Sequence, residues 1–147
     1  MTHIINRGFF IPLFLTLSLF LSSVAPAAEL ECPVCGMTFK QEAKTAFSTQ
    51  LEGKSRRLCS FACAAKTAQK YPQAGFQLND FNSGKSLNGE NAHFLIRSKN
   101  LLKELDFDMP PSVVAFASEK EAKEKTTKLG DGEIVHGWKN LKKTLAP

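Results

Sequence analysis

The first elements that the hydrophobic pattern predicts are a hairpin and a helix. Apolar and polar positions alternate in residues 45–51 (TAFSTQL), a turn follows at residues 52–54, and residues 55–59 form a returning strand. Ser60 then occupies a helix N-cap position, and the helix is expected to run to Tyr71, before Pro72. Its apolar positions recur at helical spacing: Phe61, Ala64, Ala65 and Ala68.

The pattern after residue 75 predicts further strands and a short terminal helix. Residues 75–89 are rich in Asn, Gly, Ser and Asp and indicate a strand with a long turn. Residues 92–97 (AHFLIR) and 112–117 (SVVAFA) favour strands by their branched and aromatic content. A short strand over residues 133–135 precedes a helix, one face of which carries Trp138, Leu141 and Leu145.

A charged helix is predicted before the last short strand. Ser118 and Glu121 form a capping box at its start, and Gly130 ends it. Acidic and basic residues four positions apart are typical of a solvated helix face. The pairs are Glu119/Lys123, Glu121/Lys125 and Glu124/Lys128.

Together these elements predict an α+β fold in two parts. Residues 29–74 hold a cysteine knuckle, the hairpin and the first helix, and residues 75–147 form a second small α/β half. A length of 147 residues suits one compact domain, or two very small ones that share an interface.

Residues 1–28 have the layout of a secretory signal peptide. Arg7 is followed by an apolar run of 13 residues, 9–21, and by small residues at 25–28 (APAA) that suit cleavage. An uncleaved anchor is the alternative, but a membrane span needs about 20 apolar residues. Cys32 follows Glu31 rather than the small residue that lipid modification requires. We therefore expect a periplasmic protein with no lipid anchor and no stable membrane insertion after cleavage.

The overall composition narrows the function classes. Lys and Arg number 19 against 14 Asp and Glu, a net charge of +5, and the basic residues are scattered among acidic ones. This argues against a nucleic-acid partner, which a basic patch would mark. With 43% hydrophobic and 22% charged residues, the chain fits neither a disordered protein nor a multi-span membrane protein.

Four cysteines carry the strongest chemical signal. Cys32 and Cys35 lie in C-P-V-C-G-M, and Cys59 and Cys63 lie in C-S-F-A-C, which begins 24 residues after Cys35. A C-x-x-C turn lets two sulfur atoms converge on one ion, and Gly36 permits the left-handed backbone that such a turn often takes. Because Cys59 closes a strand and Cys63 lies one turn into the helix, both sulfurs can face the same point. We expect a soft metal site.

Methionines extend the candidate ligand set, and histidines are weaker candidates. Soft ligands select Cu(I) and Zn(II), but a thioether is a poor Zn(II) ligand, so Met37 favours Cu(I). Met109, in the M-P-P segment, is a further candidate, with gap-filling by an apolar side chain as its alternative role. His93 and His136 are expected to be surface or hydrogen-bonded histidines.

Two other interpretations of the cysteines stay open. An exported protein meets an oxidising compartment, where paired cysteines form structural disulfides, and C-x-x-C motifs also occur in thiol oxidoreductases. A thioredoxin-like unit places that motif at the start of a helix after a strand, whereas here it precedes a hairpin. Metal binding is favoured first and structural disulfides second, and no enzyme activity is expected.

The order of these motifs resembles two groups of metal proteins. Residues 32–37, followed by Cys59-Ser60, Cys63 and Tyr71-Pro72, resemble the small treble-clef modules called TRASH and YHS domains. Over nearly all of residues 31–145 the chain is similar to the NosL family, with its C-G-M triplet, a strand like AHFLIRS, a methionine loop and VVAFAS before a helix. Two features depart from that family: the lipid signal is missing, and Pro110 follows the loop methionine where glycine is usual.

This resemblance implies a treble-clef-like knuckle and a copper function. NosL proteins are exported accessory proteins that bind Cu(I) and supply copper for nitrous oxide reductase. By resemblance, Cys35 and Met37 inherit the character of copper ligands, and Met109 matches the later methionine of the family. The implied function is a Cu(I) chaperone that exchanges copper with a periplasmic cuproenzyme or a copper transporter. The alternative is a Zn(II)-structured or disulfide-structured binding module.

Overall fold

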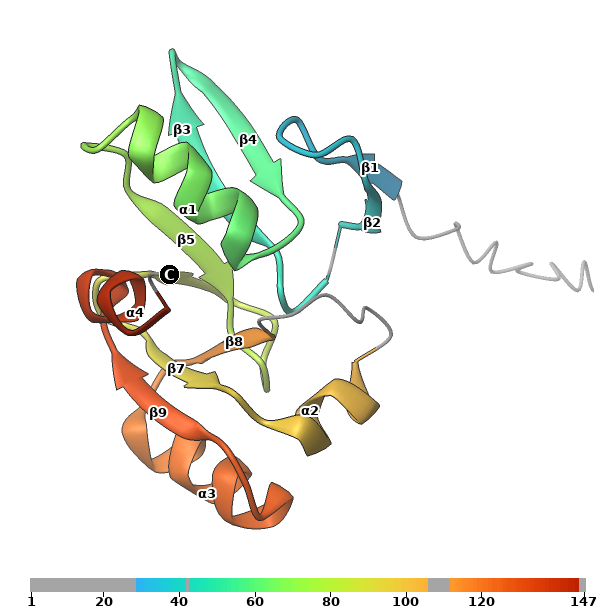
Figure 1. The fold of residues 1–147 in the computed structure, drawn as a ribbon, viewed down its shortest axis with the longest axis vertical. Helices are drawn as coiled ribbons and strands as arrows, with labels where there is room; N and C mark the ends of the chain where they lie inside the picture. Colours follow the sequence, from blue (N-terminus) through green and yellow to red (C-terminus); the bar gives the residue numbers. More distant parts are fainter. Residues whose placement is uncertain (1–28, 42, 106–111, 146–147) are drawn as a thin grey trace, which may run out of the picture.

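The computed structural model describes residues 29–41, 43–105 and 112–145, which form an α+β fold of four helices and three antiparallel sheets (Figure 1). This confirms the predicted fold class. The expected signal peptide, residues 1–28, lies outside the described residues. Within the described part of the chain, no helix combines the length and the apolar character that a membrane crossing requires.

The hairpin predicted over residues 45–59 forms the centre of a four-stranded sheet. Glu52 and Gly53 make its two-residue turn, and both have positive φ, 52° and 73°. Such a turn matches the right-handed twist of the flanking strands. The strands, in the order β4-β3-β5-β6, are Lys54–Leu58, Phe47–Leu51, Phe76–Asn79 and Ser86–Asn88. The predicted hairpin is confirmed, and the segment expected as one strand with a long turn is the β5–β6 hairpin.

A three-stranded sheet lies below the first sheet in Figure 1, with helix α3 (Glu119–Leu129) on its outer side. Ser118 and Glu121 form the predicted capping box of this helix, and Gly130 ends it with φ of +76°. The strands, in the order β8-β7-β9, are Val113–Phe116, His93–Ile96 and Glu133–His136. All three strands were predicted from their composition.

Three short elements were not predicted. Strands β1 (Glu29–Glu31) and β2 (Thr38–Lys40) pair with each other on either side of the first two cysteines. Helix α2 (Lys99–Glu104) begins at Ser98, whose hydroxyl accepts a hydrogen bond from the backbone N–H of Leu101. Three residues are too few to show the alternation of a strand, and the six residues of α2 make less than two helical turns.

An aromatic cluster joins the cysteine-rich part of the chain to its carboxyl end. Trp138 opens helix α4 (Trp138–Leu145), and its ring centroid lies 4.5 Å from that of Phe76 and 5.7 Å from those of Phe47 and Phe61. Phe61 is the first residue of α1 (Phe61–Lys70). Contacts therefore cross the expected boundary at residue 74, and residues from both sides of it build one core.

Strands β7 and β8 separate two cores. Along β7, Phe94 and Ile96 belong to the first core, which contains the aromatic cluster, whereas Leu95 belongs to a second core beneath α3. Along β8, Val113 belongs to the first core and Val114 to the second. Because both faces are covered, all four residues of β8 are buried, which explains its continuous hydrophobic run.

Asp80 links the two larger sheets. It is 2% exposed and follows β5 directly. Its carboxylate accepts hydrogen bonds from the backbone N–H and hydroxyl of Ser83, both 2.7 Å, and from the N–H of Ala117, 2.9 Å. Burial alone would raise the pKa of Asp80, but these hydrogen bonds outweigh it and hold that pKa below its ordinary value.

Replacing Asp80 with alanine should therefore destabilise the fold. The N–H groups of Ser83 and Ala117 lose their acceptor, so we expect the free energy of unfolding to fall by about 2–4 kcal/mol in chemical denaturation at neutral pH. Because the folded pKa of Asp80 is lowered, its contribution is complete above the ordinary aspartate pKa of about 3.9 and is lost as the pH falls through the folded value. The difference between wild type and Asp80→Ala should shrink below that pH.

Glu124→Gln is the control for this measurement. Glu124 is an exposed carboxylate on α3 that lies 3.9 Å from Lys120, and its loss should change the unfolding free energy by no more than about 0.5 kcal/mol. Equal effects of Glu124→Gln and Asp80→Ala would contradict the assigned role of Asp80.

Candidate metal centre

The first two cysteines lie on a tight loop between β1 and β2. The N–H of Cys32 donates to the carbonyl of Met37 (2.9 Å), and the N–H of Gly36 donates to the carbonyl of Cys32 (2.8 Å). Gly36 has φ of +73°, the left-handed backbone that its place in C-P-V-C-G-M predicted. This loop leaves Cys32 fully buried and Cys35 exposed.

The second pair of cysteines lies where β4 passes into α1. Cys59 follows Leu58, the last residue of β4, and Cys63 lies in the first turn of α1. Their exposed fractions are 0% and 4%. The prediction that Cys59 ends a strand and Cys63 enters a helix is confirmed.

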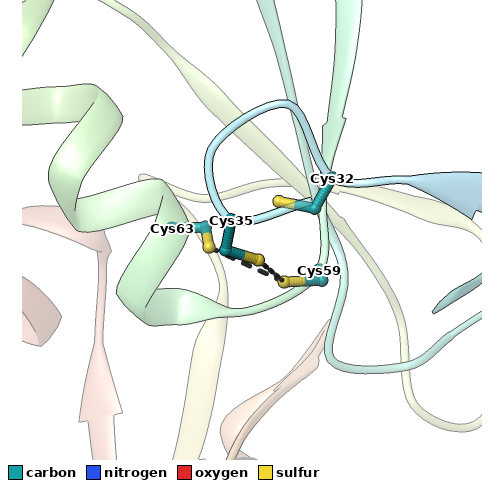
Figure 2. A group of neighbouring side chains, drawn as sticks. All are labelled: Cys32, Cys35, Cys59 and Cys63. Atoms are coloured by element: carbon teal, nitrogen blue, oxygen red, sulfur yellow. Dashed lines mark hydrogen bonds between the residues drawn. The ribbon is translucent and has the colours of Figure 1, made fainter. Parts of the chain in front are cut away.

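All four sulfur atoms converge, as Figure 2 shows, and they lie within 4.8 Å of one another. Cys59 Sγ lies 3.5 Å from Cys35 Sγ and 3.6 Å from Cys63 Sγ. A tetrahedral ion with metal–sulfur bonds of about 2.3 Å would hold its sulfurs about 3.8 Å apart. The cluster therefore has the size and the donor set to hold one metal ion, and all four cysteines are free thiols in this structure.

The electrostatics of the cluster favour the thiolate form of Cys32 and the neutral forms of Cys59 and Cys63. Burial acts to raise the pKa of Cys32, but backbone N–H groups of Cys59, Val34 and Cys35 donate to its sulfur and lower that pKa to about 7. For Cys63, burial and the hydrogen bond with Cys35 raise the pKa to about 11, and burial likewise raises the pKa of Cys59. A bound cation would stabilise the thiolate forms and lower these raised pKa values, so metal binding should release protons.

Two neighbouring polar groups belong to this site and were not predicted. The thiol of Cys59 donates to the Ser60 hydroxyl oxygen at 3.8 Å, and Thr45 donates to the Cys59 carbonyl at 3.5 Å. Ser60 does occupy the predicted N-cap position of α1, but its side chain makes no capping hydrogen bond. No sequence pattern indicates that a hydroxyl will accept a hydrogen bond from a thiol instead of capping the helix.

The remaining candidate ligands lie in different places. Met37 is half-buried directly after the loop glycine, Gly36. Met109 lies outside the described residues. His93 and His136 lie on strands β7 and β9 of the three-stranded sheet, and their rings contact each other rather than the cysteines.

Comparison of the chain with protein-family models and with curated proteins finds no match to either.

Titration of the reduced, metal-free protein should reveal a thiolate that forms with a midpoint near pH 7, since the pKa of Cys32 is lowered to about 7 whereas the pKa values of Cys59 and Cys63 are raised. The measurement is the ultraviolet absorbance of thiolate against pH. Cys32→Ser should remove this step, and Cys63→Ser is its matched control, which should retain it. A step that survives in Cys32→Ser would contradict the assignment.

Proposed function

We propose that the protein is an exported carrier that binds Cu(I) at Cys32, Cys35, Cys59 and Cys63 and passes the ion to a partner by ligand exchange. The observation that carries this proposal is the convergence of four sulfur atoms, three of them buried and one exposed. Buried ligands retain an ion, and an exposed ligand can be shared with the ligands of an acceptor.

The mutual arrangement of the sulfur atoms supports metal binding over two structural disulfides. Two disulfides would separate the four sulfurs into two pairs. Cys59 instead has near-equal distances to two partners, 3.5 Å to Cys35 and 3.6 Å to Cys63. A single ion at the centre of the four sulfurs accounts for these two near-equal distances.

Copper is favoured over zinc by the ligand chemistry around the loop. A four-thiolate set suits both Cu(I) and Zn(II), but the thioether of Met37 directly follows the loop and is a better ligand for Cu(I). Met109 would be a second thioether donor. The resemblance to NosL proteins agrees with copper, and on that resemblance the acceptor is a periplasmic cuproenzyme of the nitrous oxide reductase type or a copper transporter.

A structural Zn(II) site is the second candidate. Cys32, Cys59 and Cys63 are part of the first hydrophobic core, and buried four-cysteine sites commonly hold zinc that stabilises a fold. The two proposals differ at Cys35. A structural site needs all four ligands equally, whereas a carrier uses its exposed ligand for transfer.

The metal preference follows from the first proposal. Reduced protein should bind Cu(I) more tightly than Zn(II), because soft thiolate and thioether ligands together favour Cu(I). The measurement is competition against a chromogenic Cu(I) chelator, with bound zinc measured in the same samples. Met37→Leu should weaken Cu(I) binding without changing Zn(II) binding. If the chelator removes all copper while zinc stays bound, the structural-zinc proposal replaces the carrier.

The unequal exposure of the cysteines predicts unequal effects of substitution. Cys35→Ser should keep the far-ultraviolet circular dichroism and thermal unfolding of the metal-free protein, and should weaken Cu(I) retention at least tenfold. Cys63→Ser, the matched buried variant, should lower the unfolding free energy of the metal-free protein by about 1–3 kcal/mol, because it places a hydroxyl in a core position. A Cys35→Ser protein that unfolds would contradict the carrier proposal.

A further inference from the structure

His93 and His136 face each other across two antiparallel strands. The register of β7 and β9 pairs them directly, and their ring centroids lie 4.6 Å apart with an interplanar angle of 36°. His93 is partly buried, and His136 is exposed. The fold therefore brings together two imidazole groups that are 43 positions apart in the sequence.

The backbone around this pair is held in place. The N–H of Gly137 donates to the carbonyl of Ala92 at 2.9 Å, which continues the strand pairing beyond the histidines. The amide of Asn140 donates to the His136 carbonyl at 2.9 Å. Gly137 has φ of +77°, and a Cβ there would lie 3.0 Å from the Glu90 carbonyl oxygen, so only glycine suits this close passage. Both histidines are thus set on rigid elements, as a preorganised site requires.

One ring nitrogen of the pair lacks a hydrogen bond. His93 Nδ1 is buried and has no partner among the described residues, an unfavourable state for a ring nitrogen that a bound ion or its water ligand would relieve. Glu119, in the first turn of α3, has a lowered pKa, chiefly because Lys123 donates to it and to a smaller extent because both histidines lie near. The Lys123 amine lies 2.7 Å from the Glu119 carboxylate.

The histidine pair lies on the opposite side of the three-stranded sheet from the cysteine cluster. Side chains alternate along a strand, so His93 shares the face of Leu95, which packs in the second core under α3. Phe116, directly opposite His93 on β8, belongs to that core as well. The three buried cysteines belong to the first core, on the other face of β7. Figure 1 shows β7 and β9 side by side, with α3 on the face away from the four-stranded sheet.

We propose that His93 and His136 bind a borderline divalent transition-metal ion such as Zn²⁺, at a second site separate from the cysteine cluster. Imidazole nitrogen suits Zn²⁺, Cu²⁺ and Ni²⁺, whereas the cysteine cluster suits soft ions. Two nitrogens that bind one ion at about 2.0–2.1 Å lie about 3.3 Å apart in tetrahedral geometry, a separation that small rotations of two contacting rings provide. Water completes the coordination.

Zinc titration of the reduced protein, prepared without an affinity tag, tests this site. The first equivalent should occupy the thiols, as thiolate absorbance reports. Further Zn²⁺ should bind more weakly and shift the imidazole signals of His93 and His136 in NMR spectra. His136→Asn, at an exposed position, should weaken this second binding at least tenfold and leave the first equivalent unchanged. His93→Asn should do the same.

Glu133→Gln is the matched control, since Glu133 lies on the same strand and pairs with Arg97 rather than with the histidines. It should leave both binding steps unchanged. Imidazole signals that do not move with Zn²⁺, or second-step binding that persists unchanged in His136→Asn, would overturn the two-histidine site. Zinc binding to the thiols is measured separately, by thiolate absorbance. Either result therefore leaves the proposal for the cysteine cluster unaffected.

Discussion

Burial of three thiols is the constraint on which the proposed site depends: Cys59 and Cys63 lie where β4 passes into α1, and Cys32 lies on the loop between β1 and β2. Leu58 and Phe61, on either side of the junction of β4 and α1, are buried in the first core and fix the positions of Cys59 and Cys63. Removal of water raises the pKa of both thiols, and backbone N–H groups compensate only at Cys32. In the metal-free cluster, ionisation of all the buried thiols is therefore electrostatically unfavourable. A bound cation would stabilise the thiolates that burial disfavours.

In the proposed carrier, the same geometry would separate retention of an ion from its exchange. Three ligands are held by the core, whereas Cys35 lies on a loop that two backbone hydrogen bonds define and that solvent reaches. The proposed histidine site lies on a different face of the molecule, where α3 covers the three-stranded sheet. One small fold thus presents four thiols on one side of β7 and two imidazoles on the other, and these donor types suit different classes of metal ion.

Much of this arrangement could be predicted from local sequence signals. The capping box of α3, its final Gly130 and the hairpin turn depend on neighbouring residues alone, and the structure confirms them. The grouping of the four cysteines followed from the C-x-x-C turn and from the strand-to-helix position of the second pair.

What could not be predicted depends on contacts between distant residues. The pairing of His93 with His136 requires the register of β7 and β9, which no local pattern encodes. The predicted pair of Glu121 with Lys125 was wrong, because Glu121 caps the helix and the Lys125 amine bonds instead to Glu104, on α2. Pairing of Glu119 with Lys123 is confirmed at 2.7 Å.

We expect sulfur alone to surround a metal ion held by these cysteines. X-ray absorption spectroscopy at the copper edge, on anaerobically reduced protein loaded with one equivalent of Cu(I), measures the nearest neighbours of the ion directly. The expected result is a nearest shell of sulfur atoms only, with fewer sulfur neighbours in Cys35→Ser. A nearest shell dominated by nitrogen or oxygen atoms, or a spectrum that Cys35→Ser leaves unchanged, would contradict it.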